Sequence, residues 1–236
     1  LSARTERGIA FITDARLRPD GETGLLVNTF ETHEEYYRRR AQLWEIQSLS
    51  RTRFIAGDAA LGEQFTALTA ALSNFAEPSL PLAAYTPDWR RVIHEMRLRI
   101  EKERTPPGQD DLAIKTGRGG LMDAEFVAQA LCMAQGWHEP NTLKALERGY
   151  AETCLPQADE LIVNYLRLRR VETILRRWSY EGESTLPAEP EPFYRVSVRC
   201  GYVSPEAFRK ALTGCRQAIR RAYEAFFLGS SGSRNP

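Results

Sequence analysis

The chain has 236 residues, which is enough for one well-packed domain with or without a small appendage. Its 32 Lys and Arg residues nearly balance its 31 Asp and Glu residues. The net charge of +1 therefore gives no whole-protein field that would steer the chain to nucleic acid or to an anionic membrane. No apolar run approaches the roughly 18 residues that a membrane span needs, and the composition predicts a globular protein.

The four cysteines are Cys132, Cys154, Cys200 and Cys215. They form no C-x-x-C pair and have no histidine at metal-ligand spacing, so the sequence predicts neither a zinc site nor a disulfide framework. Reduced thiols are typical of the cytoplasm, which is the predicted location. The chain starts at Leu1 rather than at a methionine, and we expect it to be a piece of a longer protein.

Two segments within the first thirty residues have the composition of strands. Residues 8–18 are rich in β-branched and aromatic side chains and end at Pro19, and residues 24–27 form a short apolar run. A strand pair is marginal alone in water, so we expect it to belong to a sheet whose other strands precede Leu1.

The rest of the sequence has helical periodicity, with Thr32 and Glu35 in the pattern of a capping box. The predicted fold is mainly α, a helical bundle preceded by a short strand pair. Its predicted divisions are the strand piece over 1–30, the helical domain over 31–228 and a polar tail over 229–236. The predicted helices cover residues 32–50, 58–72, 88–104, 121–133, 143–150, 161–178 and 205–227.

One charged row lies at the end of the first predicted strand. Alternate side chains of a strand share a face, so Asp14, Arg16 and Arg18 would project together. A carboxylate can hold a divalent metal, and guanidinium groups bind phosphate oxygens in pairs. The row therefore fits a nucleoside triphosphate with its Mg²⁺, although spacing alone favours a solvated edge strand.

A second candidate is the glycine-rich segment that precedes the predicted helix at 121–133. Its residues Lys115, Gly117, Gly119 and Gly120 allow close backbone approach, and the helix start offers free N–H groups to an anion. The segment is neither a Walker A sequence nor a G-x-G-x-x-G fingerprint. A tight turn with Asp123 favouring the first helical turn explains it equally well.

Taken in order, these segments resemble the glutamine synthetase adenylyltransferase family, and the glycine segment also looks like that of the related PII uridylyltransferases. The resemblance extends from about Thr5 to about Phe227. The matching segments are Asp14-Ala-Arg-Leu-Arg-Pro19, Gly24-Leu-Leu-Val27, Trp44-Glu45-x-Gln47-x-Leu49-x-Arg51-x-Arg53, Gly57-Asp58 and Lys115-x-Gly117-x-Gly119-Gly120-Leu121-x-Asp123-x-Glu125-Phe126.

The resemblance implies a polymerase-β-type nucleotidyltransferase domain, here represented by its C-terminal strands, followed by a helical domain. It implies transfer of AMP from ATP to a tyrosine of glutamine synthetase, with Mg²⁺ as cofactor and a PII-type signalling protein as a further partner. Asp14 falls on a metal-binding catalytic carboxylate of the family. The nucleotide-binding positions of the family fall on Arg16, Arg18, Lys115, Gly119, Gly120 and Asp123.

In the family, a Gly-Ser turn and an Asp-x-Asp pair precede the carboxylate at the position of Asp14, and we expect them to lie upstream of Leu1. One carboxylate cannot hold the two metal ions of the reaction, so we expect the chain alone to be inactive. The form of the glycine segment favours the transferring half of the enzyme. The alternatives are the deadenylylating half, or a non-catalytic helical module that binds glutamine synthetase or a PII-type regulator.

Overall fold

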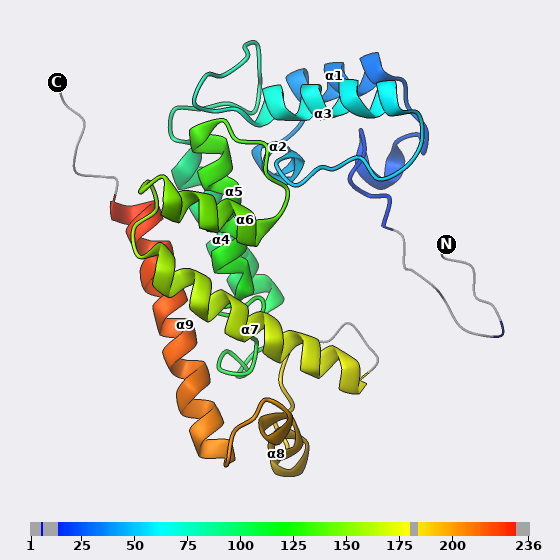
Figure 1. Cartoon of the computed structure of the whole chain (residues 1–236). Helices are drawn as coiled ribbons and strands as arrows, with labels where there is room; N and C mark the ends of the chain where they lie inside the picture. Colours follow the sequence, from blue (N-terminus) through cyan, green and yellow to red (C-terminus); the bar gives the residue numbers. More distant parts are fainter. Residues whose placement is uncertain (1–5, 7–13, 180–183, 230–236) are drawn as a thin grey trace.

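The computed structural model describes residue 6, residues 14–179 and residues 184–229 (Figure 1). Within these residues the chain forms nine α-helices and one 3-10 turn, without a sheet. The predicted mainly helical bundle is confirmed, and each described helix is too short or too polar to cross a lipid bilayer. The helices are α1 (Phe30–Arg39), α2 (Leu43–Leu49), α3 (Ala59–Ser73), α4 (Trp89–Arg104), α5 (Leu121–Gln135), α6 (Thr142–Ala151), α7 (Ala158–Ser179), α8 (Pro190–Arg199) and α9 (Pro205–Leu228).

Helix α5 is the centre of the bundle. It packs against α2, α4, α6, α7 and α9, and ten of its 15 residues are buried. Burying a side chain such as Leu131 contributes about 1.5–3 kcal/mol, while small residues such as Ala124 let the neighbouring helices come close. The helix ends at Gly136, whose φ of 66° suits a glycine C-cap. Because α5 begins directly after Gly120, its packing also fixes where the glycine-rich segment lies.

The two longest described helices, α7 and α9, lie side by side against α5 (Figure 1). The start of α7 is near the C-terminal end of α9, where Arg221 and Glu160 form an ion pair of 2.7 Å. Helix α8 packs against both at the other end of α9. One side of α9 is apolar, with Phe208, Ile219 and Tyr223 fully buried, and this explains the amphipathic pattern of its sequence.

Helices α1 to α3 form the N-terminal end of the bundle. The Tyr36 hydroxyl donates to Glu45 Oε1 at 2.7 Å and ties α1 to α2. Asp58 caps α3 by accepting from the Leu61 amide at 2.8 Å. The segment after α3 is fixed by the Phe75 amide, which donates to the Met133 carbonyl at 2.9 Å. This bond places the 74–88 connection over the end of α5.

The predicted strand pair is wrong where it can be examined. Residues 8–13 lie outside the described residues, but residues 14–27 contain turns, bends and the 3-10 turn η1 (Gly21–Thr23) instead of strands. Leu25, Leu26 and Val27 are between 72% and 81% exposed, so the second apolar run packs on no partner strand among the described residues. A strand gains its stability from a partner, and the run at 24–27 has none among the described residues.

The predicted helix over 32–50 is in fact two helices. Chain direction changes at residues 40–42, between α1 and α2. The N-cap of α1 is Thr29, whose hydroxyl accepts from the Thr32 amide at 3.2 Å, so the predicted box at Thr32 and Glu35 starts three residues too late. A second cap begins α2, where the Gln42 amide donates to Glu45 Oε2 at 2.8 Å. Tyr37, Ala41, Trp44 and Ser48 keep three- and four-residue steps through both helices, so this spacing did not reveal the break.

Candidate functional site

The glycine-rich segment over 115–120 is a tightly packed loop between α4 and α5. Gly119 has a φ of 69°, and a Cβ atom there would lie 2.0 Å from the Arg216 carbonyl oxygen of α9. A Cβ on Gly117 or Gly120 would meet backbone oxygens at 2.6 and 2.7 Å. All three positions therefore exclude larger residues for steric reasons, and Gly119 for conformational ones as well. The glycines give the loop its shape and its contact with α9.

Asp123, in the first turn of α5, stabilises this loop. Its side chain is fully buried, and Oδ2 accepts a hydrogen bond from the Gly119 amide at 2.9 Å. Its Oδ1 lies 2.6 Å from Arg97 Nε of α4, an ionic contact without hydrogen-bond geometry. Arg97 is also fully buried and donates to the carbonyls of Thr116 and Gly117 at 2.9 and 3.1 Å. Asp123 and Arg97 thus fasten the loop to two helices.

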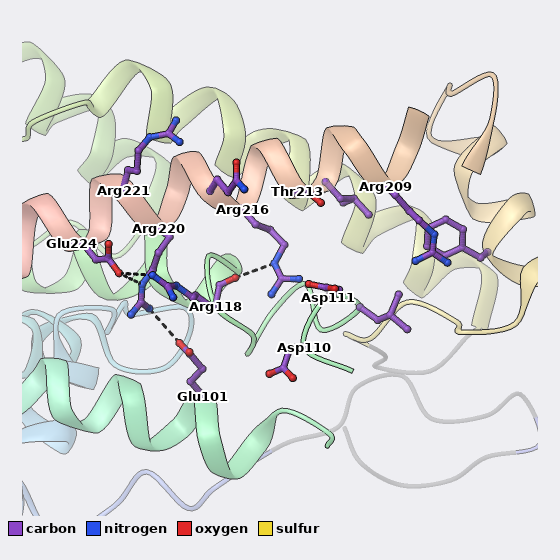
Figure 2. A pocket seen from close by; sticks show the side chains of 14 residues that line it. Glu101, Asp110, Asp111, Arg118, Arg209, Thr213, Arg216, Arg220, Arg221 and Glu224 are labelled. Atoms are coloured by element: carbon purple, nitrogen blue, oxygen red, sulfur yellow. Dashed lines mark hydrogen bonds and ion pairs between the residues drawn. The ribbon is translucent and has the colours of Figure 1, made fainter. Parts of the chain in front are cut away.

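Arg220 of α9 completes this buried charge cluster. Its guanidinium lies 3.2 Å from Asp123. The same guanidinium lies 3.2 Å from Glu101, and its Nε donates to Glu224 at 2.8 Å (Figure 2). Burial lowers the pKa of Arg220, but the hydrogen bond to Glu224 and the charges of Asp123 and Glu101 outweigh it, so the pKa is raised overall. A buried charge is tolerated only when it is paired, and the cluster meets that condition by combining two arginines with acidic side chains.

The charged residues Asp14, Arg16 and Arg18, which were predicted to project together, make different contacts from one another. Asp14 is a half-exposed carboxylate, and Arg16 donates to it through Nε at 2.9 Å and Nη2 at 2.6 Å. These hydrogen bonds lower the Asp14 pKa to about 2, so the group is ionised at neutral pH. Arg18 turns the other way and donates to the Gly24 carbonyl at 3.2 Å. Asp14 and Arg16 therefore contact each other directly, but in a segment that is not a strand, and Arg18 instead braces the following turn.

The other predicted positions lie in or beside the loop. Lys115 is half-buried, and its carbonyl accepts from the Met122 amide at 3.1 Å. Within the described chain, no hydrogen bond or ion pair joins the Asp14–Arg18 segment to the 115–123 segment. The structure therefore shows two separate groups of predicted residues, and their shared role in nucleotide binding stays a prediction.

A cleft of about 640 Å³ lies between α2, α4 and α5, and Leu17 reaches into its wall. This is the point where the Asp14–Arg18 segment comes close to the bundle. Gln47 of α2 donates to Gln129 of α5 at 2.7 Å across the cleft, and Arg51 lies 3.8 Å from Glu125. Polar and aromatic side chains share the remaining wall, namely Trp44, Ser48, Thr52, Arg99, Glu103, Arg104 and Phe126, with Met96 and Ile100.

Sequence analysis missed the two arginines that organise the buried cluster. The signal was present, because Trp89, Ile93 and Arg97 follow one another at four-residue steps and are the buried residues of α4. An arginine on the apolar face of a helix needs a buried partner. Arg220 sits beside Ile219 and close to Tyr223 on the buried side of α9. Helical spacing identifies such residues, but it does not reveal that both reach the same aspartate.

Comparison with known sequences gives two family matches. The glutamate-ammonia ligase adenylyltransferase family matches residues 1–68, and the GlnD PII-uridylyltransferase family matches residues 89–227. The bifunctional glutamine synthetase adenylyltransferase/adenylyl-removing enzyme of Streptomyces avermitilis is 34% identical over 219 residues, which cover 89% of this chain. The enzyme of the same name from Nitrosococcus oceani is 33% identical over 237 residues, covering 96% of the chain. The chain belongs to the glutamine synthetase adenylyltransferase family.

This membership confirms the resemblance seen in the sequence. The chain spans 21% of the Streptomyces avermitilis enzyme and 23% of the Nitrosococcus oceani enzyme, or about a fifth of their length. The adenylyltransferase match ends at residue 68, inside α3, and the uridylyltransferase match begins at residue 89, where α4 starts. The loop at 115–120 and the whole buried cluster therefore lie in the part that also matches the uridylyltransferases.

Proposed function

We propose that this chain is part of an enzyme that transfers AMP from ATP to a tyrosine hydroxyl of glutamine synthetase. The observation that carries the proposal is its membership of the adenylyltransferase family, supported over nearly the full chain by relatives named for that activity. The helical bundle described above would be the domain that follows the nucleotidyltransferase sheet. A PII-type signalling protein is the proposed regulatory partner, and the cytoplasm the proposed location.

Mg²⁺ is the proposed cofactor, and Asp14 has the chemistry of a ligand to it. Its carboxylate is ionised at neutral pH and about half exposed, which suits a hard oxygen ligand. Both of its oxygens accept hydrogen bonds from Arg16, so a metal ion would have to replace one of these bonds. When bound, Mg²⁺ would neutralise charge on the phosphates during transfer. Arg16, once released, could donate to a phosphate oxygen.

We assign the loop residues an indirect part in this function. Asp123 is fully buried, and its Oδ2 accepts from Gly119 while the cluster arginines surround it. It therefore supports nucleotide binding by holding the loop in place rather than by touching the nucleotide. The amides of Gly119 and Gly120 already donate to Asp123 Oδ2 and to the Gly117 carbonyl, so these two glycines would act by shaping the loop. The ammonium of Lys115 would face the phosphates. Arg18 would act in the same way as Asp123, by fixing the turn that follows Asp14.

The experiment is transfer of radiolabel from α-labelled ATP to glutamine synthetase by the complete protein that contains this chain. We expect label on the synthetase that requires Mg²⁺, and a loss of at least about 100-fold in rate for Asp14→Asn. The matched control is Asp88→Asn, an exposed aspartate at the start of α4 that pairs with Arg91. It should leave the rate unchanged.

Other outcomes distinguish the alternatives. Release of ADP from adenylylated synthetase in the presence of phosphate, without forward transfer, would assign the chain to the deadenylylating half. Binding to the synthetase or to a PII-type protein with neither reaction would identify a non-catalytic module. The chain assayed by itself should transfer no label, a prediction that rests on the family's need for further carboxylates.

A further inference from the structure

A second cavity lies between α9, the end of α4 and residues 110–118 (Figure 2). Its volume is about 710 Å³. Five arginines line it, which is unusual in a chain whose charges balance overall. They are Arg118, Arg209, Arg216, Arg220 and Arg221. A ligand would bind most readily to those arginines that are not already paired with a carboxylate.

Three of the five arginines already have carboxylate partners. Arg220 is held by the buried cluster, Arg118 lies 3.0 Å from Glu224, and Arg221 lies 2.7 Å from Glu160. These ion pairs connect α9 to the loop and to α7. Arg209 and Arg216 have no carboxylate within ion-pair distance among the residues that the structure describes. They are the cations that a ligand could engage without breaking an existing pair.

Arg216 is the stronger indication because it is buried. Only 9% of the residue is exposed, and its side chain makes one hydrogen bond in the described structure, from Nε to the Arg118 carbonyl at 2.9 Å. Figure 2 shows the guanidinium extending from α9 toward the segment that carries Asp111. Burial lowers the pKa of Arg216. The negative charge of Asp111, which lies beyond ion-pair distance, raises that pKa but does not outweigh the burial. A buried guanidinium is costly unless an acceptor approaches its terminal nitrogens.

Arg209 and an apolar wall define the rest of the cavity. The Arg209 guanidinium lies 4.0 Å from the centre of the Phe193 ring, which holds it over α8 while it stays exposed. Phe193, Leu112 and Leu212 line the same cavity. A ligand with one anionic group and an apolar body would therefore match both the free cations and the wall.

The acidic residues on the opposite wall limit the charge of that ligand. Asp110 and Asp111 line the cavity, are exposed, and form no ion pair with another described residue. They repel a ligand with two negative charges more strongly than a ligand with one. We propose that this cavity binds a small monoanionic oxyanion, a carboxylate or a phosphodiester, between Arg216 and Arg209. The proposal does not depend on adenylyl transfer and is tested on the chain alone.

The test is isothermal titration of the 236-residue chain with four probes. Benzoate represents a carboxylate, dimethyl phosphate a phosphodiester, inorganic phosphate a more highly charged oxyanion, and benzyl alcohol the uncharged control. We expect benzoate or dimethyl phosphate to bind with a Kd of about 1–10 mM, as suits so small a ligand. The preferred monoanion should bind at least about tenfold more tightly than benzyl alcohol or inorganic phosphate. Which of the two binds identifies the source of the anion.

Three variants connect binding to the named residues. Arg209→Ala should weaken binding about three- to tenfold, and its exposed position avoids unfolding the chain. Asp111→Asn should strengthen binding about two- to fivefold by removing repulsion. Arg195→Ala is the matched control, an exposed arginine of α8 outside the cavity that pairs with Glu191, and should change nothing. In the unmodified chain, the Arg216 Nε–H resonance should shift with saturation during the titration.

Several results would overturn the proposal. Equal affinity for the anions and benzyl alcohol would remove the electrostatic argument. An unchanged affinity in both Arg209→Ala and Asp111→Asn would place the ligand elsewhere, as would an Arg216 resonance that does not move while heat is released. Equal weakening in Arg195→Ala would indicate general attraction to surface arginines. A preference for inorganic phosphate would contradict the assigned charge.

Discussion

Replacing Asp123 by asparagine tests the buried cluster that holds the glycine loop. The substitution keeps the size of the side chain and an acceptor for the Gly119 amide, but it removes the negative charge that faces Arg97 and Arg220. Removing one partner of a buried ion pair costs about 3–5 kcal/mol because the other charge stays buried and uncompensated. Glu101 remains 3.5 Å from Arg97, so we expect the lower end of that range, about 3 kcal/mol.

The measurement is urea-induced unfolding of the chain, followed by far-ultraviolet circular dichroism. Asp88→Asn is the control, because this exposed aspartate pairs only with Arg91 in the described structure and should change the unfolding free energy by less than about 0.5 kcal/mol. Arg97→Met in the Asp123→Asn background should cost less than the sum of the two single changes, since the two side chains interact directly. A loss below about 1 kcal/mol for Asp123→Asn, or additive changes in the double variant, would show that the Asp123–Arg97 pair does not stabilise the fold.

Three further predictions concern the loop, a histidine and the exposed aspartate. Gly119→Ala should destabilise the chain by at least about 2 kcal/mol, whereas Gly108→Ala, with a similar φ of 72° but no atom within 4 Å, should cost only the backbone strain of about 1 kcal/mol. Burial and the charge of Arg220 lower the pKa of His94 from 6.5. The histidine therefore binds a proton more readily in the unfolded chain than in the folded one, and the free energy of unfolding should fall as the pH drops below about 6.5. The Asp14 carboxyl should titrate near pH 2 in a carbon-detected NMR experiment because of its hydrogen bonds to Arg16.

Each of these predictions has an outcome that would contradict it. Equal costs for the two glycine substitutions would show that the close contact with α9 is relieved without strain. If the unfolding free energy changed between pH 7 and pH 5 by the same amount in the unmodified chain and in His94→Gln, His94 would not cause the pH dependence. An Asp14 pKa near the ordinary value of 3.8 would show that the bonds from Arg16 do not persist in solution.

The sequence predicted most helices because their signals are local. Asp58 before α3 and the apolar spacing of α9 identify these elements without knowledge of the fold. Helix α8 was missed because it is short and carries prolines at positions 190 and 192, which read as a loop although proline suits a first helical turn. The predicted strand at 24–27 failed because a strand needs a partner that the local sequence does not specify.

The candidate site was predictable only in part. The glycines at 117, 119 and 120 indicated a close backbone approach, and the structure shows that the approach is to α9. The burial of Asp123 was not predictable, because an acidic residue in the first turn of a helix is ordinarily solvated. Its partners Arg97 and Arg220 are 26 residues before it and 97 residues after it, and the sequence gives no sign of which long-range pairs form.

We propose that this chain serves an enzyme that attaches AMP to glutamine synthetase. The most direct measurement is the intact mass of the synthetase subunit after incubation with Mg-ATP and the complete protein. We expect a gain of one adenylyl group per modified subunit, located on a tyrosine and absent when Asp14 is replaced by asparagine. A synthetase of unchanged mass under conditions where a known adenylyltransferase modifies it, with no removal of AMP from the modified form, would contradict the proposed activity.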